Sequence, residues 1–148
     1  MSSSGFAVVL ALVAGFGGAV QIAVQGRLGD RVGSFEAVAT ASLVGALVAL
    51  GVLLVVRRSL AGVGEAWGSP KWMLLGGVMS ALIILAITIA GPRIGIVATT
   101  AVLIAAQFAL AAVIDRNGWF GIERIAVTWP RVLGIALLFA GAALTLRR

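Results

Sequence analysis

Side-chain amides and hydroxyls occur inside long apolar stretches of this sequence, where they could bind a polar, uncharged part of a solute. Gln21 and Gln25 are four residues apart, so on a helix their carboxamides lie on one face. Gln107 lies in another apolar stretch, and Thr100 precedes it by seven residues on the same helical face. An amide without a hydrogen-bond partner is costly in hydrocarbon, so these groups are expected to face another helix or a watery cavity. With Ser80 from a third stretch, the residues predicted to line a substrate cavity are Gln21, Gln25, Ser80, Thr100 and Gln107.

The same side chains have a second interpretation, in which they hold helices together or bond to their own backbone. For Ser80 and Thr100 we favour this packing role, because hydroxyls in helices commonly bond to the carbonyl of the preceding turn. For Gln21 and Gln107 we favour the cavity, because a buried glutamine is bulkier and carries more hydrogen-bonding groups than a hydroxyl.

Two charged residues near predicted helix ends are further candidates for coupling or for an interface ion pair. Asp115 is predicted at the C-terminal end of a helix, where the helix dipole disfavours an anion. Arg116 or an arginine of a partner chain could compensate it, and we favour this ion pair over proton coupling. Arg93, in the predicted corner Gly91-Pro92-Arg93, could bind an anionic group, although an anchor among lipid headgroups is the commoner role.

Chemistry that depends on histidine or cysteine is excluded by the composition. The chain has no histidine and no cysteine, and its five acidic residues are scattered. These residues form no catalytic triad, no metal-binding cluster and no phosphate-binding loop. We therefore expect neither an enzyme nor a metal site, and no cofactor.

The elements that carry these residues are predicted to be membrane-spanning helices of an all-α integral membrane protein. Of 148 residues, 61% are hydrophobic and 11% are charged, against roughly a quarter charged in a soluble domain. The mean hydropathy is +1.17. A helix needs about 20 apolar residues to cross a bilayer. Five stretches meet this length within a single domain over residues 1–148, and they cover about residues 5–26, 35–56, 71–90, 94–114 and 130–146. Ser34 is predicted to cap the second helix, with Glu36 in its first turn.

The charges predict an unusual orientation in the membrane. The net charge of +6 comes from residues that flank apolar segments, which favours contact with lipid headgroups over nucleic acid. Six basic residues fall on the side of the N-terminus and five on the opposite side, so the positive-inside rule gives almost no preference. All the tryptophans fall on the N-terminal side, namely Trp67, Trp72, Trp119 and Trp129. We therefore expect an antiparallel homodimer of dual topology, or pairing with an oppositely oriented paralogue. Its five-plus-five inverted helices resemble the architecture of many transporters.

The order of these features resembles the YdcZ-type five-helix proteins of the bacterial drug/metabolite transporter superfamily. The resemblance covers the whole chain, although the family usually has asparagine at the position of Gln25. It implies a small inner-membrane protein that forms dual-topology antiparallel homodimers and that is related to ten-helix exporters. The motifs that carry it are Gln21-x-x-x-Gln25-x-x-Leu28-Gly29, Ser42-x-x-Gly45, Gly76-Gly77, Pro92-Arg93-x-Gly95, Gln107, Asp115-x-x-Gly118, Gly134 and Gly141.

These observations predict a transporter of the bacterial inner membrane that moves a small organic solute by alternating access. The substrate is unidentified, and the expected partners are a second copy or a paralogue and membrane lipid. Two alternatives remain open at this stage. The chain could form a dual-topology channel for a small ion, or it could be a scaffold or accessory subunit that transports nothing.

Overall fold

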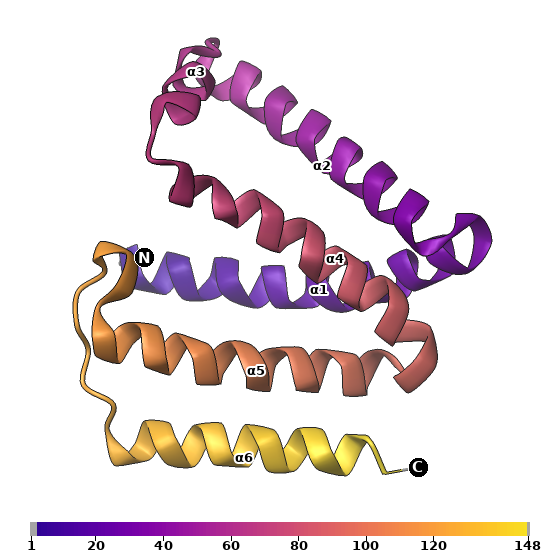
Figure 1. The fold of residues 1–148 in the computed structure, drawn as a ribbon, viewed down its shortest axis with the longest axis vertical. Coiled ribbons are helices and arrows are strands. Elements are labelled where there is room, and N and C mark those ends of the chain that lie inside the picture. Colours follow the sequence, from indigo (N-terminus) through magenta and orange to yellow (C-terminus); the bar gives the residue numbers. More distant parts are fainter. Residues whose placement is uncertain (1–2, 148) are drawn as a thin grey trace. The chain divides into compact units, whose positions relative to one another are not determined.

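The computed structural model describes residues 3–147, and these residues form helices joined by short connections, with no strand among them (Figure 1). This confirms the all-α fold class. The elements in chain order are α1 (Ser3–Val32), α2 (Ser34–Arg57), α3 (Ala61–Gly68), the short 3-10 helix η1 (Lys71–Leu74), α4 (Leu75–Ile94), α5 (Ile96–Asn117), a second 3-10 helix η2 (Trp119–Gly121) and α6 (Trp129–Thr145).

Within residues 3–147, four helical stretches are long and apolar enough to cross a membrane. They are α1, α2, the continuous stretch of η1 and α4, and α5. The last apolar helix, α6, has 17 residues. At 1.5 Å per residue it is about 25 Å long, at the short end of what spans a hydrocarbon core of about 30 Å.

The first helix is longer than expected from its apolar stretch. We expected it to end at Gly26, but α1 continues through Arg27, Asp30 and Arg31 to Val32. Charged residues mark where a helix leaves the hydrocarbon core of the membrane, but the backbone hydrogen bonds of the helix can continue beyond them. The break comes at Gly33, whose φ of 101° is a conformation that side chains disfavour. Gly33, and not Ser34, takes the cap position of α2, and Glu36 lies in the first turn as expected.

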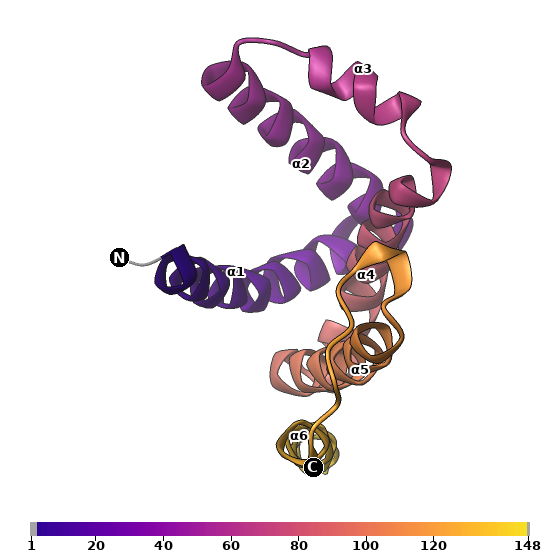
Figure 2. The ribbon, with the colours of Figure 1, turned by 90° about the vertical axis from the view of Figure 1, so that its left-hand side faces the viewer.

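Two other connections also differ from expectation. The glycine-rich connector after Arg58 contains the helix α3, which Figure 2 shows crossing from the end of α2 to the start of η1. The corner expected at Gly91-Pro92-Arg93 is helical, because α4 includes Pro92 and ends at Ile94. The turn is instead made by one residue, Gly95, with a φ of 88°.

The chain forms two compact units. One unit is Ala23–Pro92, and the other combines the N-terminal part of the chain up to Ile22 with the part from Arg93 onward. In the first unit, the end of α1 packs closely on α4. A Cβ atom added to Gly26 would lie 3.0 Å from Cγ and Cδ of Pro92, and one added to Gly29 would overlap Cγ2 of Thr88. These glycines therefore allow the two helices to approach.

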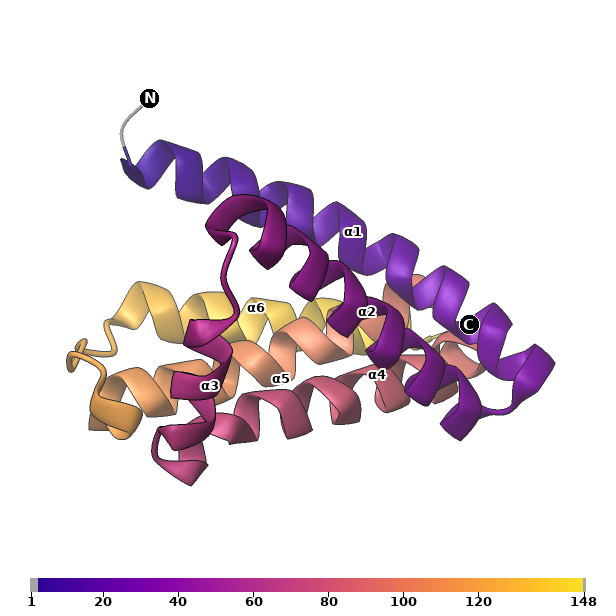
Figure 3. The same cartoon turned by 90° about the horizontal axis from the view of Figure 1, so that it is seen from above.

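In the second unit, α5 and α6 run antiparallel and side by side, as Figures 1 and 3 show. The segment between them folds back onto the end of α5. The backbone N–H of Ile125 donates to the carbonyl oxygen of Asp115 at 2.9 Å, and that of Gly118 donates to Ile114 at 2.8 Å. A Cβ on Gly118 would lie 2.7 Å from Cγ of Arg124, so this segment is held against the helix end. It thereby fixes where α6 begins relative to α5.

Candidate functional site

A groove of about 590 Å³ lies between the second half of α5 and the first half of α6. Its size falls within the range of roughly 300–1,000 Å³ that is usual for small-molecule sites. Its walls are mostly apolar. Its polar side chains lie at two positions along α5, with Asp115 and Arg131 at one and Gln107 at the other. The residues that line it are Gln107, Phe108, Ala111, Ala112, Asp115, Pro130, Arg131, Gly134 and Ile135.

An ion pair closes one end of this groove. Nη1 of Arg131 lies 3.4 Å from Oδ2 of Asp115, and the two side chains are 45% and 31% exposed. Asp115 was expected to need a compensating charge, for which Arg116 or a partner chain was considered. In the structure that charge comes from Arg131 of the same chain, placed by the antiparallel return of α6.

Both charges of the pair lie at the unfavourable end of their own helix. Asp115 is in the last turn of α5, where the partial charge of the helix is negative. Arg131 follows Pro130 in the first turn of α6, where the partial charge is positive. Each placement costs about 0.3–1 kcal/mol in an exposed helix, and an exposed ion pair returns only about 0–1 kcal/mol. Helix stability therefore does not explain why these two charges are here.

Gln107 provides the polar group at the other level of the groove. It lies eight residues before Asp115 on α5, which is about 12 Å along the helix axis. Its side chain is exposed, and its amide makes no hydrogen bond within residues 3–147. Phe108, Ala111 and Ile135 line the apolar part of the groove. Gly134 adds no side chain to the groove. A Cβ atom added there would project into open space, with no other atom within 4 Å.

The other predicted cavity residues lie outside this groove. Thr100 is on α5, and its hydroxyl donates to the carbonyl oxygen of Ile96 at 2.8 Å, which is the backbone bonding considered above for hydroxyls. Gln21 and Ser80 are exposed, on α1 and α4. Arg93 is exposed near the end of α4. The structure thus brings Gln107 and Asp115 into one groove, and the joint cavity of all five cavity residues stays a prediction.

Gln25 stands apart among the predicted residues because it is buried. Only 5% of it is exposed, and its Nε2 group has no hydrogen-bond partner in the part of the chain described. It lies next to Gly26, where α1 packs against Pro92 of α4. A buried amide without a partner costs about 1–3 kcal/mol, so this position also is poorly explained by stability alone.

Sequence reasoning missed Arg131 as a site residue. A detectable signal was present, since an arginine directly after Trp129-Pro130 falls in the first turn of a helix, where a cation is unfavourable. The matching signal at Asp115 was recognised. Pairing the two required the path of the intervening segment, which the amino-acid pattern does not supply.

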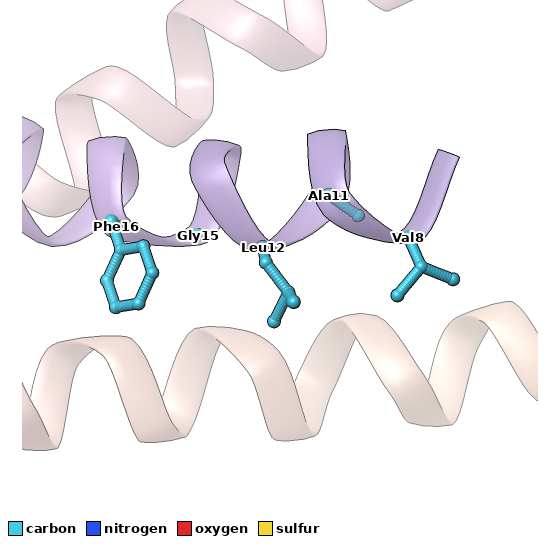
Figure 4. Close-up of a pocket in the computed structure, with 5 residues that line it drawn as sticks. All are labelled: Val8, Ala11, Leu12, Gly15 and Phe16. Carbon is cyan, nitrogen blue, oxygen red and sulfur yellow. The ribbon is translucent and has the colours of Figure 1, made fainter. Parts of the chain in front are cut away.

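A second hollow lies on one face of α1 and, unlike the α5–α6 groove, has no polar side chain in its lining. Figure 4 shows Val8, Leu12 and Phe16 projecting from the same side of this helix, with Ala11 and Gly15 between them. All the residues that line this hollow are apolar and come from one helix, and Phe16 is 75% exposed. Such a face suits contact with lipid or another helix, and it offers no group that could recognise a polar solute.

Long apolar helices with exposed apolar side chains are those of a multi-pass membrane protein. The family described as "Putative inner membrane exporter, YdcZ" matches residues 6–144. The chain belongs to this family, and it is a multi-pass protein of the inner membrane. Comparisons with curated proteins and with solved structures gave no match.

Proposed function

We propose that this protein exports a small organic solute by alternating access, as an antiparallel homodimer of five-span chains. The groove between α5 and α6 carries the proposal, because in a family of exporters it presents polar groups that packing does not use. Gln107 would hydrogen-bond the solute, Asp115 and Arg131 would bind its charged or polar end, and Phe108 and Ile135 would contact its apolar part.

The location of Gln107 supports a role in binding. An amide at membrane depth that lacks a hydrogen bond is costly, and a solute or a second protein chain would supply the missing partner. Polar residues at this depth in membrane proteins commonly mark a substrate pathway. The same argument applies to Nε2 of Gln25.

Three observations support the antiparallel homodimer. The basic residues divide six to five between the two membrane sides, and all four tryptophans belong to one side. The most apolar stretch of α2 has no buried residue, so this helix has its surface available for contact. An inverted second copy would supply the second tryptophan belt and a second α5–α6 groove, and inverted repeats commonly place a transport site where they meet.

Export from cells tests the proposal. Wild type, Gly134→Leu and Gly141→Leu would be expressed at matched levels in bacteria, and solutes in cells and medium would be compared by mass spectrometry. A Cβ at either glycine meets no other atom within 4 Å, but only Gly134 lines the groove. We expect one or more solutes to accumulate in the medium with wild type and Gly141→Leu, and not with Gly134→Leu. Equal export by Gly134→Leu, or no difference between wild type and empty vector, would overturn the proposal.

A further inference from the structure

The ion pair of the α5–α6 groove retains binding capacity on both partners. Only Nη1 of Arg131 and Oδ2 of Asp115 are in contact, and their distance of 3.4 Å is long for a charged hydrogen bond, which is usually about 2.7–2.9 Å. Within residues 3–147, Oδ1 of Asp115 and the remaining guanidinium N–H groups of Arg131 have no partner. A ligand could therefore bind both side chains at little cost in lost contacts.

The two opposite charges select the charge pattern of that ligand. A ligand with a single positive charge would pair with Asp115 alone, and a ligand with a single negative charge would pair with Arg131 alone, so each would use only half of the charged site. A ligand with both signs would satisfy both residues. From this geometry we infer that the groove takes a zwitterionic amphiphile, with its cationic group at Asp115, its anionic group at Arg131 and its apolar body along Phe108 and Ile135. This inference rests on the proposed function and names the substrate class of the same site.

The dimensions of the groove favour a solute over a membrane phospholipid. Its volume of about 590 Å³ suits one compact ligand. A membrane phospholipid, with its two long acyl chains, is larger than this groove. A solute with an acceptor or donor at its far end could in addition bond to the amide of Gln107, about 12 Å from Asp115 along the helix axis.

Binding in detergent solution tests the inference without requiring transport. Purified protein in a maltoside detergent would be titrated with three octyl compounds, namely a sulfobetaine, a trimethylammonium and a sulfonate, and tryptophan fluorescence would report binding. Trp129 directly precedes the groove residues Pro130 and Arg131 and is a nearby reporter. We expect wild type to bind the sulfobetaine about tenfold more tightly than either singly charged compound. Gly134→Leu should abolish binding, and Gly141→Leu should leave it unchanged.

Charge-removing variants sharpen the test. Asp115→Asn should weaken binding of the sulfobetaine and the ammonium compound about tenfold and spare the sulfonate, and Arg131→Gln should spare the ammonium compound instead. Melting temperature and gel filtration would verify folding, and the swapped variant D115R/R131D, which keeps both charges, should retain the preference for the sulfobetaine.

Equal affinity of wild type for all three compounds would overturn the inference. Displacement of the sulfobetaine by phosphatidylethanolamine in mixed micelles would also overturn it, since the groove would then be a lipid site. If charge selectivity is absent but Gly134→Leu still blocks export, the substrate class is wrong and the exporter function stands.

Discussion

Asp115 in the last turn of α5 and Arg131 in the first turn of α6 form an ion pair in which each charge opposes the dipole of its own helix. The antiparallel arrangement of α5 and α6 brings the two unfavourable ends together, so each charge compensates the other. Helix stability alone therefore does not account for the placement of these two charges.

Exchanging the two charges should stabilise the protein. In D115R/R131D the ion pair is retained, while the arginine now lies at a helix C-terminus and the aspartate at a helix N-terminus. We expect a gain of about 1–4 kcal/mol in unfolding free energy, because both dipole interactions change sign. Thermal unfolding in detergent would measure it, with Arg131→Lys as the control that keeps the original polarity. A swapped variant less stable than wild type would contradict the dipole argument.

Replacing Gln107 with leucine should separate function from stability. The amide has no hydrogen bond within the described chain, so an apolar side chain of similar size should be neutral or stabilising by up to about 1 kcal/mol. Export should fall at least tenfold, since the solute loses its hydrogen-bonding group. Melting temperature and the mass-spectrometric export assay would report the two effects. A large loss of stability would instead show that Gln107 bonds to protein, for example in a second copy.

Close packing of α1 on α4 predicts a specific double-mutant result. Gly29→Ala should destabilise the protein by about 1–3 kcal/mol, because the new methyl group would overlap Cγ2 of Thr88. Thr88→Ser removes that methyl group and keeps the hydroxyl that bonds to Ile84, so G29A/T88S should recover most of the loss. Gly17→Ala is the control, since a Cβ there meets no other atom within 4 Å. Additive effects of the two substitutions in thermal unfolding would argue against this contact.

Dual topology predicts that a single external residue labels in only about half of the molecules. The chain has no cysteine, so Ala61→Cys in α3 and Asp30→Cys near the end of α1 would report the two membrane sides separately. A membrane-impermeant thiol reagent should modify about half of each variant in intact cells, and all of it after permeabilisation. Complete labelling of one variant and none of the other would establish a single orientation and exclude the self-paired antiparallel dimer.

Much of the fold could be predicted because its elements depend on local composition. Stretches of about 20 apolar residues that cross a membrane form helices because their backbone groups must bond within the segment, and Glu36 falls in a first turn as expected. The ends of the helices were harder to predict. Hydropathy shows where a segment stops being apolar, but α1 continues past that point to Val32 and is broken by the backbone conformation of Gly33. The helix α3 was missed because glycines and serine dominate its surroundings.

The site was less predictable than the fold. Gln107 and Asp115 were predicted as candidates because an amide in an apolar stretch and an anion at a helix C-terminus are locally unfavourable, and the structure places both in one groove. Arg131 was not paired with Asp115, because the contact depends on how the connecting segment returns and bonds through Ile125. Whether Gln21, Gln25 and Ser80 share a cavity with Gln107 depends on the assembled protein, which local patterns do not determine.

The single-residue connections at Gly33 and Gly95 have a mechanical consequence. Each joins two long helices through one glycine with positive φ, and the next helix starts at once, with Ala37 donating to the carbonyl of Gly33 and Thr99 to that of Gly95. Such a joint has only two soft backbone torsions, so any change in the angle between its two helices must occur by rotation about φ and ψ of that glycine. The connections after Arg58 and Gly118 are longer, and the one after Gly118 is held at the end of α5 by the bond from Ile125 to Asp115. In the pairs α1–α2 and α4–α5, a change in the angle between the two helices is therefore concentrated at one glycine, Gly33 in the first pair and Gly95 in the second.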